Sequence, residues 1–187
     1  FVNFLIKSLT EGFHTEINSL PTIPLECKNL LSARQDPDTI TRLLDDELKK
    51  GYLIGPYVEI PFEIYHINPI GLAQSKYSKK KRLIVDMSAP HNNQDHPSLN
   101  ELINKENFSL QYVTIDHAVR IIQSLGKGSW LCKADIMDAF KLIPIHPSLW
   151  PYHGIKNNNK YYFFTRRNNY NQNRLKECFV WGRVKAS

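Results

Sequence analysis

The sequence predicts an α+β fold in which helices alternate with short strands and hairpins. Apolar residues recur at helical spacing after Asp36 and again after Thr114. Short apolar or aromatic runs bounded by turn residues indicate a hairpin over 70–87, a strand over 130–136 and a second hairpin over 153–165. Because neither element type dominates, we expect both in one mixed architecture.

The first helix is predicted to begin at Asp36, an N-cap residue followed by Pro37 at the first helical position. Gly51 is a typical stop signal. Between them the apolar positions have helical spacing: Ile40, Leu43, Leu44 and Leu48. Residues 1–35 show no sustained period, and we expect an irregular lead-in there.

The second helix is predicted to begin after Thr114 and to end at Gly126. Three prolines, Pro56, Pro61 and Pro69, break residues 52–70 into short extended pieces. The run Asn157–Asn159 is a plausible hairpin turn between the last two strands.

The bulk composition fits one large domain, or one domain and a part, of ordinary globular type. No apolar run approaches the roughly 20 residues of a membrane span, so we expect no membrane partner. The three cysteines are far apart and odd in number, which argues against a disulfide framework. We therefore expect an intracellular location, in the cytoplasm or nucleus. Residue 1 is not Met, so we do not expect it to be the natural start.

The basic charge is concentrated rather than spread along the chain. The net charge is +6, of which residues 156–187 contribute eight cations and one anion, leaving −1 for the other residues. One internal group also stands out, with five cations between Lys76 and Arg82. A solvated hairpin tip is the plain alternative to a binding role for that group.

The stretch from Trp130 to Phe140 carries the clearest chemical signal. An apolar run ends on Asp135, and a second carboxylate, Asp138, follows three residues later before Ala139 and Phe140. A carboxylate at the end of a buried strand is a rigid oxygen ligand of the kind that Mg²⁺ sites use. Asp135 could instead cap the following turn, and Phe140 taken alone is more often a core aromatic.

This stretch resembles the first catalytic motif of retroelement reverse transcriptases, which is an apolar strand, Asp, and a small and an aromatic residue shortly after. The segment Arg82–Ser88 resembles the fingers strand of the same family, about 50 residues upstream and preceded by a lysine-rich hairpin. Short segments such as Asn68–Leu72 and Asp86–Asn93 resemble specifically the reverse transcriptases of DIRS-type, tyrosine-recombinase retrotransposons. The resemblance covers about residues 25–165.

The resemblance implies a fold, namely the fingers and an incomplete palm sheet of a polymerase right hand. Residues 36–165 would form this part, after the lead-in 1–35 and before a divergent basic tail, 166–187. The implied activity is template-directed DNA synthesis by two-metal phosphoryl transfer, with Mg²⁺ or Mn²⁺ as cofactor. Its partners would be a nucleic-acid template–primer and deoxynucleoside triphosphates.

The resemblance also implies residue roles. Asp135 would be the catalytic metal ligand, and Ile136 would offer a backbone carbonyl to one metal. Arg82 and Lys76 would bind the triphosphate, with Arg82 gripping it bidentately. The nucleotide site would also include Asp138 and Ala139 beneath the phosphates. Phe140 would lie under the sugar, where it leaves no room for a 2′-hydroxyl.

The family pattern breaks after Arg166. The aromatic-x-Asp-Asp hairpin that supplies the other metal carboxylates is not among the 187 residues, and the composition changes abruptly. A frameshift or a degenerate element would produce this change. One aspartate cannot hold two divalent ions against their repulsion, so we expect no polymerase activity from these residues alone.

Two other interpretations stay open at this point. The chain could be a non-enzymatic nucleic-acid-binding fragment that uses the Lys76–Arg82 hairpin and the basic tail. It could also be the product of a decayed element, without function. Histidines 91 and 96 near Asp95 are a poor metal site, because no further ligand lies at suitable spacing.

Overall fold

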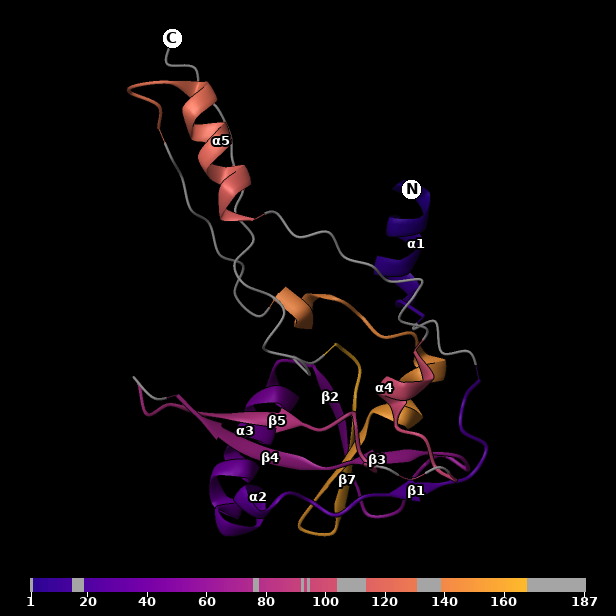
Figure 1. Ribbon diagram of the computed structural model, residues 1–187. Helices are drawn as coiled ribbons and strands as arrows, with labels where there is room; N and C mark the ends of the chain where they lie inside the picture. Colours follow the sequence, from indigo (N-terminus) through magenta and orange to yellow (C-terminus); the bar gives the residue numbers. More distant parts are fainter. Residues whose placement is uncertain are drawn as a thin grey trace. The chain divides into compact units, whose positions relative to one another are not determined.

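The computed structural model describes residues 2–14, 19–75, 78–91, 93, 95–103, 114–130 and 139–167. Two compact units make up the chain. The first consists of Phe1–Asn104 and Asp138–Tyr170, and the second of Lys105–Met137 and Asn171–Ser187. All the strands of the described residues belong to the first unit, which mixes helices and sheets and is α+β as predicted (Figure 1).

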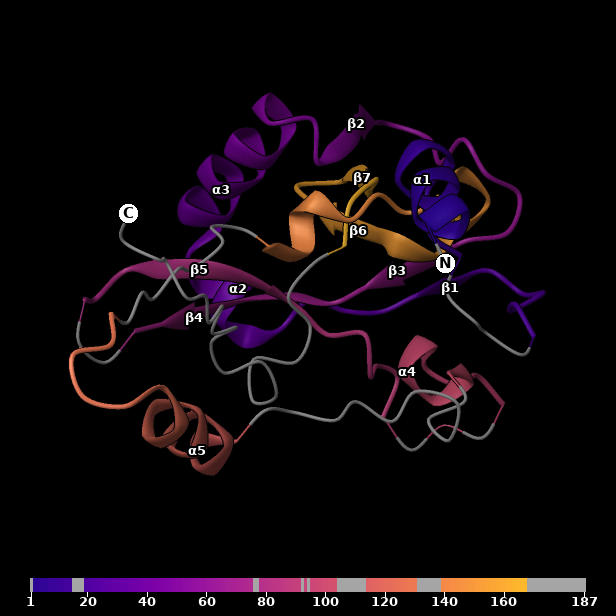
Figure 2. The same cartoon turned by 90° about the horizontal axis from the view of Figure 1, so that it is seen from above.

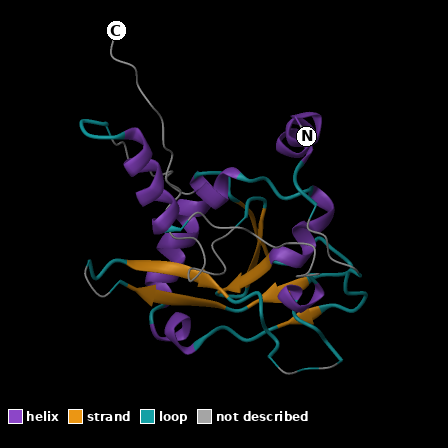
Figure 3. Ribbon diagram, turned by 45° about the horizontal axis from the view of Figure 1, so that its top comes forward, coloured by secondary structure: helices purple, strands orange, loops and turns teal. Residues whose placement is uncertain are grey.

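The larger sheet has five strands in the order β1-β3-β6-β7-β2. The strands are β1 (Leu25–Glu26), β3 (His66–Asn68), β6 (Gly154–Asn157), β7 (Lys160–Phe164) and β2 (Leu53–Tyr57). β1, β3 and β6 pair in parallel, whereas β6, β7 and β2 pair antiparallel. Segments separated by more than 100 residues in the sequence, β2 and β7, therefore become neighbours in this sheet. Figure 3 shows the strands in orange among the purple helices.

The predicted hairpin over 153–165 is confirmed as the β6–β7 pair. Its two turn residues, Asn158 and Asn159, have φ values of +48° and +57°. This left-handed backbone is what a tight two-residue hairpin turn requires, and asparagine tolerates it better than most residues. The asparagine run thus fixes where the chain reverses.

A separate two-stranded sheet pairs β4 (Ile70–Gln74) with β5 (Lys81–Val85). The register runs from Ile70 opposite Val85 to Gln74 opposite Lys81, which confirms the hairpin predicted over 70–87. Helix α2 (Leu31–Gln35) contacts β4, and helix α3 (Pro37–Lys49) contacts both β5 and β2 (Figure 2).

Helix α3 begins and ends where the sequence predicts. Asp36 accepts a hydrogen bond from the Thr39 backbone N–H at 3.2 Å, and Pro37 occupies the first turn. Gly51 has φ +71° just beyond the last turn, a conformation that glycine adopts without a Cβ penalty. Ile40 and Leu44 are fully buried, so the predicted apolar face is the one that enters the core.

The segment 1–35, predicted to be irregular, contains regular elements: α1 (Val2–Glu11), β1 and α2. In α1, the apolar residues Val2, Phe4, Ile6 and Leu9 are exposed, whereas the polar residue Ser8 is buried. Its apolar residues therefore do not mark the side that packs. β1 is two residues long and exists through its pairing with β3, a partner about 40 residues away.

The remaining described elements are short or belong to the second unit. They are α4 (Leu99–Leu102), the 3₁₀ helices η2 (Ala139–Leu142) and η3 (Pro147–His153), and α5 (Ile115–Leu125). α5 lies in the second unit and confirms the helix predicted after Thr114, with Gly126 at its end. The predicted strand 130–136 falls outside the described residues except for Trp130, which is not in a strand.

The core of the first unit is formed by residues from α2, α3, α4 and η3 and from strands of both sheets. Asn68 is fully buried within it, and its side-chain N–H group donates to the backbone carbonyls of Tyr152 (3.0 Å) and Gly154 (3.1 Å). The most deeply buried apolar residues of the core cluster are Ile40, Leu44, Ile70, Leu99, Ile155 and Phe164. In the described part of the chain, no helix is both long and apolar enough to cross a bilayer.

Candidate functional site

Three of the predicted site residues lie in described parts of the structure: Arg82, Ala139 and Phe140. The other four, Lys76, Asp135, Ile136 and Asp138, lie outside the described residues. The site can therefore be built from the β4–β5 hairpin and from η2, which directly follows Asp138 in the sequence.

Arg82 lies on β5 opposite Ala73, and its side chain is exposed. Its strand neighbours Leu83 and Val85 point to the other face and pack on or within the core. The alternation of the strand thus directs the guanidinium away from the core. A planar guanidinium in such a place can grip an anion bidentately.

The hairpin tip is organised by backbone hydrogen bonds. The Ser75 N–H donates to the Lys80 carbonyl at 3.1 Å, and the Lys79 N–H donates to the Ser75 carbonyl at 3.2 Å. The side-chain amide of Gln74 also donates to the Lys79 carbonyl, at 3.1 Å. Lys79 and Lys80 are exposed at this tip, so two cations accompany Arg82 along one short hairpin.

Lys81 has a different role from its neighbours. Its Nζ atom lies 2.6 Å from Oδ2 of Asp36, the N-cap of α3. The hydrogen bond from Lys81, and after it that from Thr39, holds the pKa of the Asp36 carboxyl below its ordinary value. Lys81, one of the five predicted cations, therefore connects the hairpin to the N-terminus of α3 through an ion pair.

The η2 turn carries the other two described candidates. Ala139 is exposed and Phe140 is partly buried. Next to them, Nζ of Lys141 lies 2.5 Å from Oε1 of Glu47 on α3 and 5.5 Å from the ring centroid of Tyr52. These contacts attach to α3 the turn that contains Ala139 and Phe140, the end of the Asp135 motif.

The hairpin and η2 are thus anchored to the same helix, at Asp36 and Glu47. Eleven residues separate the two anchors, which corresponds to roughly 16 Å along a helix axis. Within the described ranges no hydrogen bond or ion pair joins Arg82 to Ala139 or Phe140. Both elements are therefore attached to one helix, with no hydrogen bond or ion pair between Arg82 and the two described candidates of η2.

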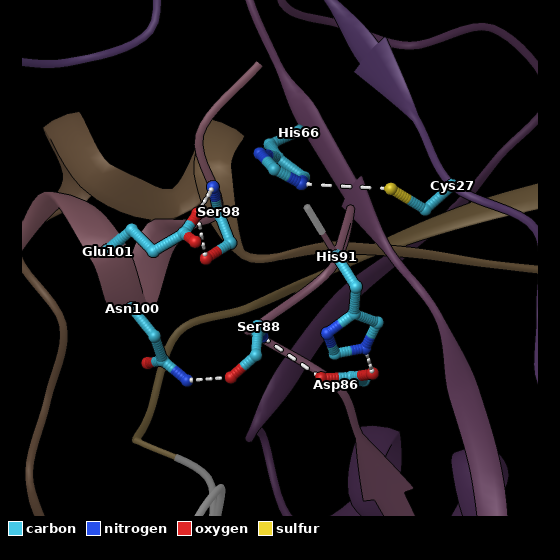
Figure 4. Close-up of polar contacts among 8 residues, drawn as sticks. All are labelled: Cys27, His66, Asp86, Ser88, His91, Ser98, Asn100 and Glu101. Atoms are coloured by element: carbon cyan, nitrogen blue, oxygen red, sulfur yellow. Dashed lines mark hydrogen bonds and ion pairs between the residues drawn. The ribbon is translucent and has the colours of Figure 1, made fainter. Parts of the chain in front are cut away.

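A network of polar side chains connects residues of the segment that follows β5 (Figure 4). The carboxylate of Asp86 accepts a hydrogen bond from the Ser88 N–H at 3.0 Å and lies 2.8 Å from Nε2 of His91. Ser88 Oγ in turn accepts from the side-chain amide of Asn100 at 2.8 Å. The sequence marked Asp86 by its place in a motif, whereas its pairing with His91 could be found only in three dimensions.

The two predicted metal ligands, Asp135 and Ile136, lie outside the described residues. In the parts that the structure does describe, no group of three or more His, Cys, Asp or Glu residues could hold a metal ion. The expectation of a divalent metal therefore rests on the sequence motif.

Comparison with solved structures gives the fold. A crystal structure of the protease–reverse transcriptase of prototype foamy virus, a selenomethionine-labelled CSH mutant, matches with a TM-score of 0.51 and 18% identity, over 81% of this chain. This chain has a reverse-transcriptase-like fold. The native form of the same viral enzyme also matches, with a TM-score of 0.51 and 16% identity, over 86% of this chain.

At this identity the likeness concerns the fold alone. The chain covers 18% of the length of each of these two viral chains, so it corresponds to a small part of them. No family model matches the sequence. No curated protein matches it either.

Proposed function

We propose that this chain is the fingers and part of the palm of a retroelement reverse transcriptase, most like the DIRS-type elements. The observation that carries the proposal is the reverse-transcriptase-like fold over 81% of the chain. The sequence motifs support it, because Arg82 and Asp135 occur in the order and at the separation of that family. The proposed fingers and partial palm span residues 36–165, after the segment 1–35 and before the divergent tail 166–187.

In this proposal the chain contributes the nucleotide-binding half of a polymerase site. Arg82, with Lys76 from the same hairpin, binds the triphosphate of the incoming nucleotide. Asp138 and Ala139 lie beneath the phosphates, and Phe140 supports the sugar. The exposed position of Arg82 and the anchoring of η2 through Lys141 support these roles.

Asp135 and the backbone carbonyl of Ile136 are the proposed ligands of a divalent metal. Mg²⁺ or Mn²⁺, when bound, would stabilise negative charge on the transferring phosphoryl group. The 187 residues contain no aromatic-x-Asp-Asp motif to complete the ligand set. Binding of template–primer and nucleotide, rather than polymerisation, is therefore the activity proposed for these residues alone.

The experiment measures binding of a fluorescent RNA/DNA template–primer to the 187-residue chain by anisotropy, with and without the complementary deoxynucleoside triphosphate and Mg²⁺. We expect the matched nucleotide to tighten binding and Arg82→Ala to abolish that gain, with Arg82→Lys in between. Arg42→Ala is the matched control, since Arg42 is exposed on α3. An equal gain from mismatched nucleotides would overturn the proposal.

A separate assay addresses catalysis. Primer extension by the wild-type chain is expected to equal that of Asp135→Asn, at background level. Extension above this control would show that the residues present suffice for synthesis. It would overturn the expectation of inactivity and leave the proposed family role in place.

A second candidate is a nucleic-acid-binding fragment without a nucleotide site. The exposed cations Lys79, Lys80 and Arg82 favour it, because such a patch binds phosphates without regard to sequence. Its affinity would be weak, with Kd of order 10⁻⁴–10⁻⁶ M, and would fall steeply with salt. Binding that is salt-dependent, indifferent to nucleotide and unchanged by Asp135→Asn would select this candidate.

A further inference from the structure

The two strands of the β4–β5 hairpin, which run side by side (Figure 1), have different outer edges. The Asp86 N–H donates to the Pro69 carbonyl at 2.9 Å, which fixes the alternation of hydrogen-bonded and non-bonded residue pairs along the hairpin. The residues whose N–H and C=O groups consequently point outwards are Ile70, Leu72 and Gln74 on β4, and Lys81, Leu83 and Val85 on β5.

The outer edge of β4 is already paired with the chain around the start of α2. The Ile70 N–H donates to the side-chain carbonyl of Asn29 at 3.1 Å, and the Ile70 carbonyl accepts from the Leu30 N–H at 3.0 Å. The Leu72 N–H donates to Oγ of Ser32 at 3.0 Å. These bonds close β4 to any further strand.

The outer edge of β5 is open near the tip of the hairpin. β5 is the last strand on this side of its sheet. Within the described residues, no hydrogen bond reaches the outward N–H or C=O group of Lys81 or Leu83. Lys81 is exposed and Leu83 is half-buried, whereas Val85 further along the strand is buried. Unpaired main-chain groups on an edge strand are a template for pairing with another chain.

The exposed charges beside this open edge are positive. Arg82, Lys79 and Lys80 are exposed, and the carboxylate of Asp36 is already paired with Lys81. A second copy of the chain would place like charges opposite one another across the strands, which is unfavourable. A DNA phosphate backbone would meet the cations but offers acceptors only, so the outward carbonyls of β5 would stay unpaired. An acidic polypeptide satisfies both the charges and the main-chain groups.

We propose that the outer edge of β5 binds an extended acidic segment of another polypeptide as an added antiparallel strand. The segment pairs its N–H and C=O groups with those of Lys81 and Leu83. An acidic residue opposite Arg82 then occupies a non-hydrogen-bonded pair, in which side chains lie closest together. The recognised pattern alternates acidic residues, on the Arg82 face, with aliphatic residues on the Leu83 face. This pairing requires no nucleotide and is independent of the proposed polymerase role.

The probe is a capped heptapeptide in which glutamate and valine alternate, titrated into the 187-residue chain at neutral pH without nucleotide. NMR follows the amide signals and their hydrogen exchange. In the free chain, the amides of Lys81 and Leu83 should exchange fast, and those of Arg82 and Ile84, which point towards β4, should exchange slowly. We expect the peptide to give saturable shifts in β5 and to slow exchange at Lys81 and Leu83.

Sequence variants of the peptide test the charge preference. Replacing its glutamates with serine should weaken binding about fivefold, and replacing them with lysine should remove saturable binding. Arg82→Ala should weaken the glutamate peptide but not the serine peptide. Arg42→Ala, at an exposed position on α3, is the matched control and should change neither.

Methylated peptides test the strand pairing itself. In the antiparallel register, the valine N–H groups face β5 and the glutamate N–H groups face away. N-methylation of three valines should therefore abolish binding, whereas N-methylation of three glutamates should leave it largely intact. Equal effects of the two methylations, or slow exchange of the Leu83 amide in the free chain, would overturn the proposal. Equal protection of Lys81 and Leu83 by a single-stranded DNA heptamer would overturn it in favour of a nucleic-acid partner.

Discussion

The Nζ atom of Lys141 lies 2.5 Å from Oε1 of Glu47, a residue 94 positions earlier in the sequence. The two side chains are only 20% and 11% exposed, so this ion pair is largely shielded from water. It joins η2, which contains the end of the Asp135 motif, to the C-terminal half of α3. Because α3 also holds the β4–β5 hairpin through Asp36, a single helix supports both parts of the proposed site.

Lys141→Met is expected to lower the free energy of unfolding by about 2 kcal/mol, because it leaves the Glu47 carboxylate buried without its cation. Glu47→Leu combined with Lys141→Met should recover much of this loss, since an apolar pair removes both charges together. Urea denaturation of the single and double variants measures the effect. Lys160→Met, at an exposed position on β7, is the control. A similar loss in that control would show that the ion pair is not responsible.

Asp36 combines an N-cap with an ion pair, and two substitutions separate these contributions. Asp36→Asn keeps a capping side chain but removes the charge that pairs with Lys81, whereas Asp36→Ala removes both. We expect Ala to destabilise more than Asn. A reversed order would show that capping contributes little here.

The Asp36 pair also has a predicted dependence on pH. Because the folded pKa of this carboxyl is depressed, its stabilisation is present above the unfolded pKa and is lost as pH falls through the folded pKa. The difference in unfolding free energy between wild type and Asp36→Asn should therefore shrink in acid. Added salt should reduce the same difference, since the pair is exposed.

Local signals predicted α3 and both hairpins. The bounds of α3 depend on Asp36, Pro37 and Gly51, and the β6–β7 turn depends on its asparagines. Each of these residues lies at the end of the helix or in the turn that it specifies. The same kind of local pattern predicted the strand that carries Arg82. It could not reveal that Lys81 is an anchor, because its partner lies 45 residues away. β1 and the Lys141–Glu47 pair were missed for the same reason.

The two buried histidines predict a loss of stability below neutral pH. Burial, and secondly the charges of Arg167 and His66, lower the pKa of His153 to about 3, while that of His66 is about 4. Both rings stay neutral in the folded state between pH 6.5 and about 4, whereas the unfolded chain takes up protons there. The unfolded state is thus favoured as pH falls, by up to about 1.4 kcal/mol per pH unit for each histidine.

Chemical denaturation at pH 7, 6 and 5 measures this slope. His66→Gln and His153→Gln should each flatten the dependence of the unfolding free energy on pH, and the double variant should flatten it further. The single variants are compared by slope and not by absolute stability, because each also alters packing. A slope unchanged in both variants would mean that neither ring remains neutral on folding.

Gly154 is needed for close packing at the start of β6. A Cβ at this position would lie 2.5 Å from Cδ1 of Ile67, 2.8 Å from Cε1 of Phe163 and 3.0 Å from the His66 carbonyl oxygen. Its φ of −75° is accessible to any residue, so the requirement is for space and not for conformational freedom. Gly154→Ala is expected to lower the free energy of unfolding by about 1–3 kcal/mol through overpacking.

Ile67→Val tests the cause, because it removes the Cδ1 atom that the new methyl group would meet first. The double variant Gly154→Ala/Ile67→Val should be less destabilised than the sum of the two single variants, as measured by urea denaturation. Simple additivity would mean that the clash with Ile67 does not set the cost. The ring of Phe163 on β7 and the carbonyl of His66 on β3 would then be the obstacles, so a side chain at this position would require β6 to shift against both of its neighbouring strands.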